Sequence, residues 1–276
     1  MSSKSNPDVI AHLDKKRGKI FSKTGGWFPG KAVYSHGYSM LDELVGEKTY
    51  FQIMILNATG KLVEKPVADW VEGIYACLSW PDPRIWCNQI GALAGASRAS
   101  ALAATTAGVL ATDSRSYGVL PIIEGVTFIQ QAKDLADNGK SPEEIIQSLC
   151  KMQGGKPAIV GYRRPIASGD ERLEAMERVS KKLEMDEGEH LQLAYRVENF
   201  LLEKYNEGMN INGYVAARMS DFGFTSEEIY NMYTTAVASG VTACYLEEKN
   251  RGPDEFLPLQ CNDIDYIGAD YRPVNK

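Results

Sequence analysis

Two adjacent arginines, Arg163 and Arg164, lie in a loop bounded by glycines, within the stretch GKPAIVGYRRPIASGDERL. A guanidinium group presents several N–H donors in a planar fork, which matches the oxygens of a phosphate or a carboxylate. A glycine such as Gly161 also lets a ligand approach the backbone closely. This arrangement predicts a loop that binds an anion. The alternative is a pair of solvated surface arginines, which is the common environment of arginine.

The composition excludes several classes of function. The chain has 276 residues, of which 44% are hydrophobic, so it can bury a large core. Its net charge is −6 without a basic excess, so nucleic acid is not an expected partner. The N-terminus is polar and no apolar run reaches about 18 residues, so neither a secretory signal nor a membrane span is expected. The five cysteines form no CxxC pair, which predicts reduced thiols, no metal site and a cytoplasmic protein.

Helix signals dominate the chain. The stretch SPEEIIQSLCKM begins with Ser141 as an N-cap and has Glu144 at the capping-box position. A second capping box, Thr225 with Glu228, opens TSEEIYNMYTTAVASGVTACYLEEKNRG, which we expect to be one helix that ends at Lys-Asn-Arg-Gly. Strand signals are confined to short pieces such as KAVYSHGY. The sequence therefore predicts a mostly α-helical protein.

The segment 88–113 is rich in Ala, Gly, Ser and Thr. Small residues let helix backbones approach each other closely, so this segment predicts a packed helix pair at a core or at a subunit interface. Arg98 and the hydroxyl groups argue against a membrane helix. We expect this segment to form part of the interface of a homodimer.

Five stretches of the chain, in order, resemble motifs of one family. They are VYSHGYSMLDELVGEKTYFQIMILNATGKL, WPDPRIWCNQIGALAGASRAS, GYRRPIASGDERL, NINGYVAARMSDFGF and DIDYIGADYRPV. The third is similar to GFGHPVYKxxDPRA, and the fourth, the most specific of the five, is similar to NVDGAIAALLLDLGF. From Lys31 onward the chain thus resembles the citrate synthase superfamily, especially its short members of the citryl-CoA lyase type.

The resemblance implies an all-α, citrate synthase-like fold with a large and a small helical domain, and a dimer with the active site between the domains. The domains implied are an N-terminal arm (1–30), the first part of the large domain (31–153), a small domain that contains the arginine loop (154–222), and the C-terminal part of the large domain (223–276).

The resemblance also implies that the arginine loop closes over coenzyme A or an acyl-CoA as cosubstrate. The residues that would bind this cosubstrate are Ile159, Val160, Gly161, Tyr162 and Arg163, largely through their backbone. No metal is implied.

Three catalytic positions of the family are substituted in this chain. The family uses an aspartate as the base and two histidines as hydrogen-bond donors. The aspartate position is Asn212, whose amide cannot accept the proton, and the second histidine position is Arg164, a good donor but a weak acid. The first histidine belongs in SRSYGVLPIIEG, where Tyr117 and Glu124 are found. We therefore assign catalysis to these four residues.

Three of these four residues have a simpler structural interpretation. Tyr117 could replace a histidine as a hydrogen-bond donor, or be a packed aromatic. Glu124 could be a substitute base, or a glutamate that begins a helix. Asn212 could orient the thioester carbonyl, or be an ordinary helix-start residue.

Two further residues are candidates for substrate binding. Arg172 matches the arginine of the family's DPRA, which implies that it holds a carboxylate; the alternative is an exposed ion pair with Asp170 or Glu174. His36 lies where the family often has arginine, and its alternative is a polar residue with satisfied hydrogen bonds.

We therefore expect a divergent citrate synthase-like enzyme that forms or cleaves a carbon–carbon bond adjacent to an acyl-CoA or carrier thioester, in the citryl-CoA lyase and citrate synthase class. Arg172 alone is too little positive charge for the three carboxylates of citrate, so we expect another small carboxylate or acyl thioester as substrate. The alternatives are a catalytically inactive scaffold or binding subunit, and an enzyme of another reaction class that uses the same cleft.

Overall fold

The computed structural model describes residues 7–115, 118–164, 169–252, 255 and 262–274. Contacts divide the chain into two units: unit 1 is Met1–Ile74 with Pro121–Tyr233, and unit 2 is Tyr75–Leu120 with Thr234–Lys276. This division differs from the large and small domains that the resemblance implies, and those domain boundaries stay a prediction.

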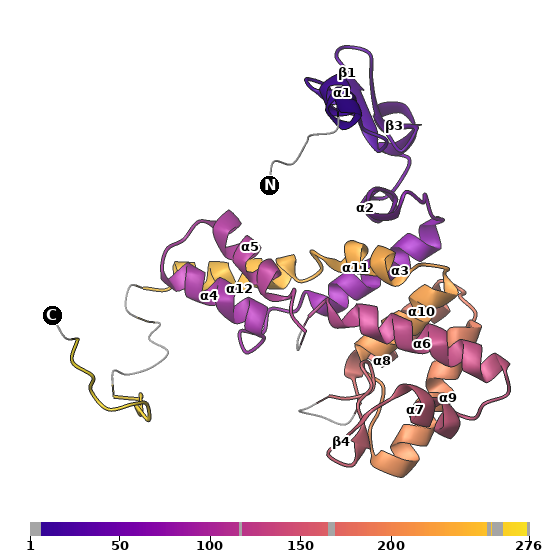
Figure 1. Ribbon diagram of the computed structural model, residues 1–276, viewed down its shortest axis with the longest axis vertical. Helices are drawn as coiled ribbons and strands as arrows, with labels where there is room; N and C mark the ends of the chain where they lie inside the picture. Colours follow the sequence, from indigo (N-terminus) through magenta and orange to yellow (C-terminus); the bar gives the residue numbers. More distant parts are fainter. Residues whose placement is uncertain (1–6, 116–117, 165–168, 253–254, 256–261, 275–276) are drawn as a thin grey trace. The chain divides into compact units, whose positions relative to one another are not determined.

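Among the described residues, unit 1 contains most of the helices and every strand. Figure 1 shows these elements, coloured along the sequence. Before the central part of the chain its elements are α1 (Pro7–Lys16), β1 (Gly25–Phe28), β2 (Ala32–Ser35), β3 (Tyr38–Ser39), the π-helical turn η1 (Met40–Leu44), α2 (Tyr50–Thr59) and most of α3 (Lys65–Leu78). They are followed by α6 (Pro121–Asp137), α7 (Pro142–Leu149), β4 (Met152–Gln153), β5 (Lys156–Pro157), α8 (Glu171–Lys182), α9 (Glu189–Tyr205), α10 (Ile211–Asp221) and α11 (Ser226–Tyr233). Unit 2 contains the end of α3, α4 (Trp86–Ala96), α5 (Ala101–Ala111) and α12 (Ala238–Asn250).

The helical character expected from the sequence is confirmed. The strands form only two short antiparallel sheets among the described residues, β1-β2-β3 and β4-β5. Both capping boxes are formed: the Ser141 backbone N–H donates to Glu144 over 2.9 Å, and the Thr225 backbone N–H donates to Glu228 over 2.9 Å. Across the described ranges, each helix is too short or too polar to cross a membrane.

The prediction of a single helix after Thr225 is wrong, because the chain forms two helices there. Helix α11 ends at Tyr233 and α12 begins at Ala238, with a turn over 234–237. The turn coincides with the boundary between the two units. Two β-branched threonines, Thr234 and Thr235, lie at this point and have a low intrinsic preference for helix.

Helix α10, which carries the most specific family-like motif, is the most deeply buried helix of unit 1. Ile211 and every residue from Gly213 to Ser220 are buried, and α10 packs against α6, α8 and α9. Tyr214 of α10 stacks on Trp70 of α3 with ring centroids 6.1 Å apart, and Ser180 of α8 accepts a 2.9 Å hydrogen bond from the Trp70 indole. This contact network fixes the position of α10 against α8 within unit 1.

The small residues of segment 88–113 are used within unit 2. Helices α4 and α5 both pack against α12. A Cβ atom at Gly91 would lie 2.6 Å from the Val241 carbonyl oxygen, and one at Gly108 would lie 2.8 Å from the Cys87 carbonyl oxygen. The expected close helix packing is therefore present, at the core of this unit.

Candidate functional site

The loop 159–164 faces the core of unit 1 with its apolar side chains. Ile159 and Tyr162 are buried, the Tyr162 ring packs edge-on to Phe128 with centroids 5.9 Å apart, and its hydroxyl lies 3.4 Å from the Ala194 carbonyl oxygen. Burial raises the pKa of the Tyr162 phenol, so it stays protonated. Of the expected cofactor-binding residues, these two can therefore offer only their backbone to a ligand.

Asn210 joins the arginine loop to the start of α10. Its backbone N–H donates to the Gly161 carbonyl over 2.8 Å, and its carboxamide donates to the Arg163 carbonyl over 2.7 Å. The same carboxamide oxygen accepts from the backbone N–H of Asn212 over 2.8 Å, which makes Asn210 the N-cap of α10. One side chain thus fixes both the loop and the helix that carries Asn212.

Gly161 is in contact with α10 itself. Its φ is +99°, in the region that favours glycine, and a Cβ atom there would lie 2.6 Å from the Cα of Gly213. The missing side chain at Gly161 therefore serves the close packing of the loop on α10. This explains the glycine without a ligand.

Arg164 and Arg172 are both held by carboxylates at the start of α8. Arg164 is bound in a bidentate manner by Glu171, with Nη1 to Oε2 at 2.5 Å and Nη2 to Oε1 at 3.1 Å. Arg172 is bound by Asp170, with Nε to Oδ1 at 2.8 Å and Nη2 to Oδ2 at 2.6 Å. Asp170 is one of the two alternative partners that the sequence suggests for Arg172, the other being Glu174. The pair is not on the surface, however, since the Asp170 side chain has 0% exposure.

These contacts set the charge of the acidic groups. Burial on its own raises the pKa of Asp170, but the hydrogen bonds and charge of Arg172, with the backbone N–H of Ile211, outweigh burial and hold the pKa below its ordinary value. The hydrogen bonds from Arg164 lower the pKa of Glu171 in the same way. Both carboxyl groups are therefore ionised at neutral pH.

We call the residues described above the arginine cluster: Arg163, Arg164, Asp170, Glu171, Arg172, Asn210 and Asn212. Two of its polar groups are available to a ligand. The carboxamide of Asn212 is half-buried, and the guanidinium of Arg163 is exposed. Neither group has a hydrogen bond or an ion pair with the described part of the chain. The structure thus places Arg163, Arg164, Arg172 and Asn212 on segments that contact one another. Within the described chain Arg164 and Arg172 are ion-paired, whereas the side chains of Arg163 and Asn212 have no such partner.

The other candidates lie elsewhere or outside the described residues. Glu124 is exposed in the first turn of α6; the next residue, Gly125, faces the loop, with a Cβ position 3.8 Å from the Val160 carbonyl oxygen. Tyr117 lies outside the described residues.

His36 belongs to the sheet near the N-terminus, where it follows β2. Its backbone N–H donates to the Thr24 carbonyl over 2.5 Å, and its ring lies beside Gly60 at the end of α2. The contacts of the described chain place it in this sheet, and none of them joins it to the arginine cluster.

Glu171 and Asn210 also belong to this cluster, although neither is among the site residues predicted from the sequence. A signal for Asn210 was present, because Asn is a preferred N-cap and it stands directly before the first residues of a predicted helix. Glu171 stands where the similar motif DPRA has proline, so the appearance of a carboxylate together with the change of His to Arg164 was a second signal.

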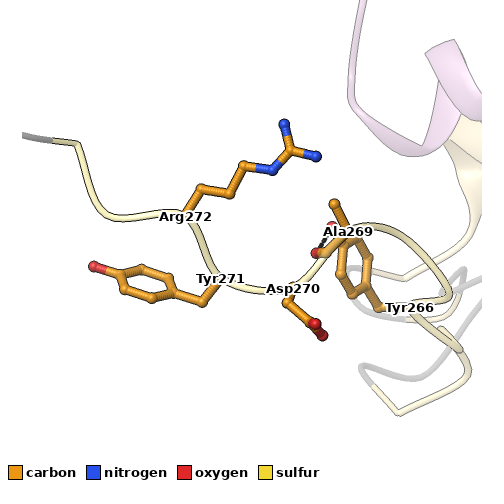
Figure 2. Close-up of a pocket in the computed structure, with 5 residues that line it drawn as sticks. All are labelled: Tyr266, Ala269, Asp270, Tyr271 and Arg272. Carbon is orange, nitrogen blue, oxygen red and sulfur yellow. Dashed lines mark hydrogen bonds between the residues drawn. The ribbon is translucent and has the colours of Figure 1, made fainter.

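A separate hollow lies in the C-terminal segment, lined by Tyr266, Ala269, Asp270, Tyr271 and Arg272 (Figure 2). The Tyr266 hydroxyl donates to the Ala269 carbonyl over 2.7 Å, and both tyrosines are largely exposed. One short segment forms the whole lining, so this hollow does not enclose a ligand by itself. In the described ranges no group of His, Cys, Asp and Glu side chains has the arrangement of a metal site.

No family model matches the sequence, and no curated protein matches it. Solved structures do match the fold. The citryl-CoA lyase of Hydrogenobacter thermophilus has a TM-score of 0.76 and 21% identity, over 93% of this chain and 97% of that one. An ATP citrate lyase of Methanosaeta concilii in complex with (3S)-citryl-CoA has a TM-score of 0.75 and 17% identity, over 98% of this chain and 45% of that one.

A citrate synthase of Thermoplasma acidophilum is more distant in structure. Its ternary complex with carboxymethyl coenzyme A and oxaloacetate has a TM-score of 0.56 and 14% identity, over 83% of this chain and 59% of that one. Together these likenesses show that the chain has the citrate synthase-like helical fold.

Proposed function

We propose that this protein is a divergent citrate synthase-like enzyme that forms or cleaves a carbon–carbon bond adjacent to an acyl-CoA or carrier thioester, with a substrate other than citrate. The observation that carries this proposal is the joining of three segments by Asn210 and Asp170. These segments are the arginine loop and the starts of α8 and α10, which are the ones that the resemblance links to cofactor, carboxylate and base.

The ligand chemistry is supported by the structural neighbours. The Hydrogenobacter enzyme is named for its action on citryl-CoA, and the Methanosaeta enzyme holds (3S)-citryl-CoA. In this chain Arg163 would contact an anionic group of coenzyme A, and the loop backbone would contact the rest. A cytoplasmic location and a homodimer are part of the same proposal.

The substituted residues suit only part of the family's chemistry. Bond formation requires loss of a proton from the carbon next to the thioester carbonyl, and then attack of the resulting enolate on an acceptor carbonyl. The guanidinium of Arg164 has five N–H groups, and those that Glu171 and Gly169 do not engage are suitable donors to the developing oxyanion. The Asn212 carboxamide is suitable to orient the thioester carbonyl. Glu124 and Tyr117 stay as candidates for the proton transfers.

Titration calorimetry with coenzyme A and acetyl-CoA tests the cofactor part of the proposal. We expect binding by the wild-type protein, and Arg163→Ala should weaken it by about 1.5–3 kcal/mol, the scale of one charge-assisted hydrogen bond. Arg178→Ala removes an exposed arginine farther along α8 and should leave binding unchanged. No binding by the wild type at millimolar ligand would contradict the proposal.

A thiol-release assay with acetyl-CoA and oxaloacetate tests the substrate part. Without an aspartate at position 212 the rate should fall by a factor of about 10²–10⁴ relative to an enzyme with its general base. A robust rate of citrate formation would show that the assignment of Asn212 and Arg164 to the catalytic positions is wrong.

A non-catalytic scaffold or binding subunit is the second candidate. It is favoured by two observations: Asn212 cannot serve as a base, and Arg164 is already bound by a carboxylate of the protein itself. This candidate predicts that acyl-CoA binding is absent, or is present without turnover of any acyl thioester tested.

A further inference from the structure

The pairing of Arg164 with Glu171 has a consequence for the choice of substrate. Both nitrogens of the Arg164 fork are engaged by the two Glu171 oxygens, and Nη1 also lies 3.3 Å from the Gly169 carbonyl oxygen. A bidentate carboxylate is the ligand that an arginine fork fits best. Glu171 therefore binds Arg164 in the way that a carboxylate of the substrate would.

The net charge of the cluster is small. Three arginines (163, 164 and 172) face two carboxylates (170 and 171), so one positive charge is left over, on Arg163. Citrate carries three carboxylates, and oxaloacetate carries two. Because the proposed function uses Arg163 for coenzyme A, the described part of the cluster keeps no further unpaired cation for a substrate with several carboxylates.

The two carboxylates differ in how firmly they are held. The Asp170 side chain has 0% exposure and also accepts a hydrogen bond from the backbone N–H of Ile211 over 2.9 Å. Displacing Asp170 would therefore break the hydrogen bonds that connect the start of α8 to the start of α10. The Glu171 side chain is 59% exposed, and within the described chain its carboxylate is bound by Arg164. Glu171 is therefore the carboxylate that an incoming anion would have to displace.

We propose that Glu171 is a specificity-determining residue, whose carboxylate fills the Arg164 fork in place of a second substrate carboxylate. This inference rests on the function proposed above and names its substrate class: an acyl thioester partner with at most one free carboxylate. A dicarboxylate must expel Glu171 and then lie beside its negative charge, which costs binding energy twice. A monocarboxylate does not need the Arg164 fork, so it meets neither cost.

Equilibrium dialysis with labelled malate, a dicarboxylate, and labelled lactate, a monocarboxylate, tests this proposal on the full chain. Glu171→Gln keeps the size of the side chain but frees the Arg164 fork. It should raise the affinity for malate at least about tenfold, the scale of one charge-assisted pair, and should change the affinity for lactate less than about threefold.

Two control variants show where the gain arises. Glu174→Gln removes an exposed carboxylate from the same first turn of α8 and should change neither affinity. In the double variant Arg164→Gln with Glu171→Gln, the gain for malate should be lost. Circular dichroism melts show that each variant is folded.

The proposal is overturned if Glu171→Gln gains no affinity for malate, if Glu174→Gln gains as much, or if the gain persists without Arg164. These outcomes are independent of the calorimetry with coenzyme A. If the wild type binds no coenzyme A but Glu171→Gln gains affinity for malate, the proposed enzyme function is contradicted and the role of Glu171 is supported. If the wild type binds coenzyme A but Glu171→Gln gains no affinity for malate, the role of Glu171 is contradicted and the proposed function is supported.

Discussion

Asp170 is the most fully engaged side chain near the arginine loop. It accepts hydrogen bonds from the Arg172 guanidinium, and from the backbone N–H groups of Arg172 and Ile211, at 2.6–3.1 Å. Because these donors belong to the starts of α8 and α10, one carboxylate connects both helix termini. The negative charge of Asp170 therefore contributes to the stability of unit 1.

Asp170→Asn should lower the free energy of unfolding by about 2–3 kcal/mol at neutral pH, because it leaves buried donors without their charged partner. The pKa of Asp170 lies below its ordinary value in the folded state. Its contribution is thus complete above the unfolded pKa of about 3.9 and is lost as the pH falls through the lower folded pKa. Urea unfolding at pH 7, 5 and 3 should show the difference between wild type and variant shrinking only at the lowest pH.

Glu174→Gln is the matched control for this prediction. It removes an exposed carboxylate one turn away and should change stability by less than about 0.5 kcal/mol at every pH. A loss in Asp170→Asn that is as large at pH 3 as at pH 7 would contradict the role assigned to the carboxylate charge.

At the same scale, the sequence indicated which residue types could bind an anion but not which partners they bind in the fold. The segments that carry Arg163, Arg164, Arg172 and Asn212 do contact one another. The partner of Arg164, however, is seven residues along the chain, and whether Glu171 reaches it depends on the path of the loop between them. Residue types and spacing indicate an anion site, but they do not tell whether the anion comes from a ligand or from the protein.

The packing of the arginine loop on α10 is the decisive contact at the scale of the elements. Gly161 and Gly213 touch through their backbones, and Asn210 bonds to the loop on either side of Tyr162. A loop held in this way keeps Arg163 and Arg164 at the end of a buried helix, which is a rigid support for a binding site.

Gly161→Ala should therefore be much more harmful than an alanine at another glycine of positive φ. The new Cβ would meet the Gly213 backbone at 2.6 Å in addition to the strain at φ +99°. We expect a loss of about 3 kcal/mol or more in the free energy of unfolding by urea. Gly155→Ala, at φ +80° with no atom within 4 Å of its Cβ position, should cost only about 1 kcal/mol. Equal losses would mean that the loop moves away from α10 easily.

Helix starts were predictable where the signal is local. Ser141 with Glu144, and Thr225 with Glu228, form their capping boxes within four residues, so no tertiary information is needed. The end of α11 was not predictable in this way. The chain leaves one unit there and enters the other, and Thr234 and Thr235 are only a weak local sign of that change.

For the whole molecule, the small-residue segment has two sides with different uses. Gly91 and Gly108 face α12 within unit 2, so part of the signal that suggested a subunit interface is explained inside the chain. Large apolar side chains are nevertheless left on the same helices: Leu93 is 43% exposed, Leu102 79% and Leu110 69%. Exposed apolar side chains grouped on adjacent helices are typical of a surface that binds another protein.

We therefore predict that the protein is a homodimer whose interface includes α4 and α5. Sedimentation velocity at micromolar concentration should give a mass near twice 30.5 kDa. Leu102→Lys with Leu110→Lys should shift it to the monomer, because two desolvated charges would face the partner, while these exposed positions place no strain on the fold of unit 2. Ile20→Lys, at a position 99% exposed outside these helices, should leave the dimer intact. A wild-type protein that sediments as a stable monomer, or a dimer that survives the double lysine variant, would place the interface elsewhere or remove it.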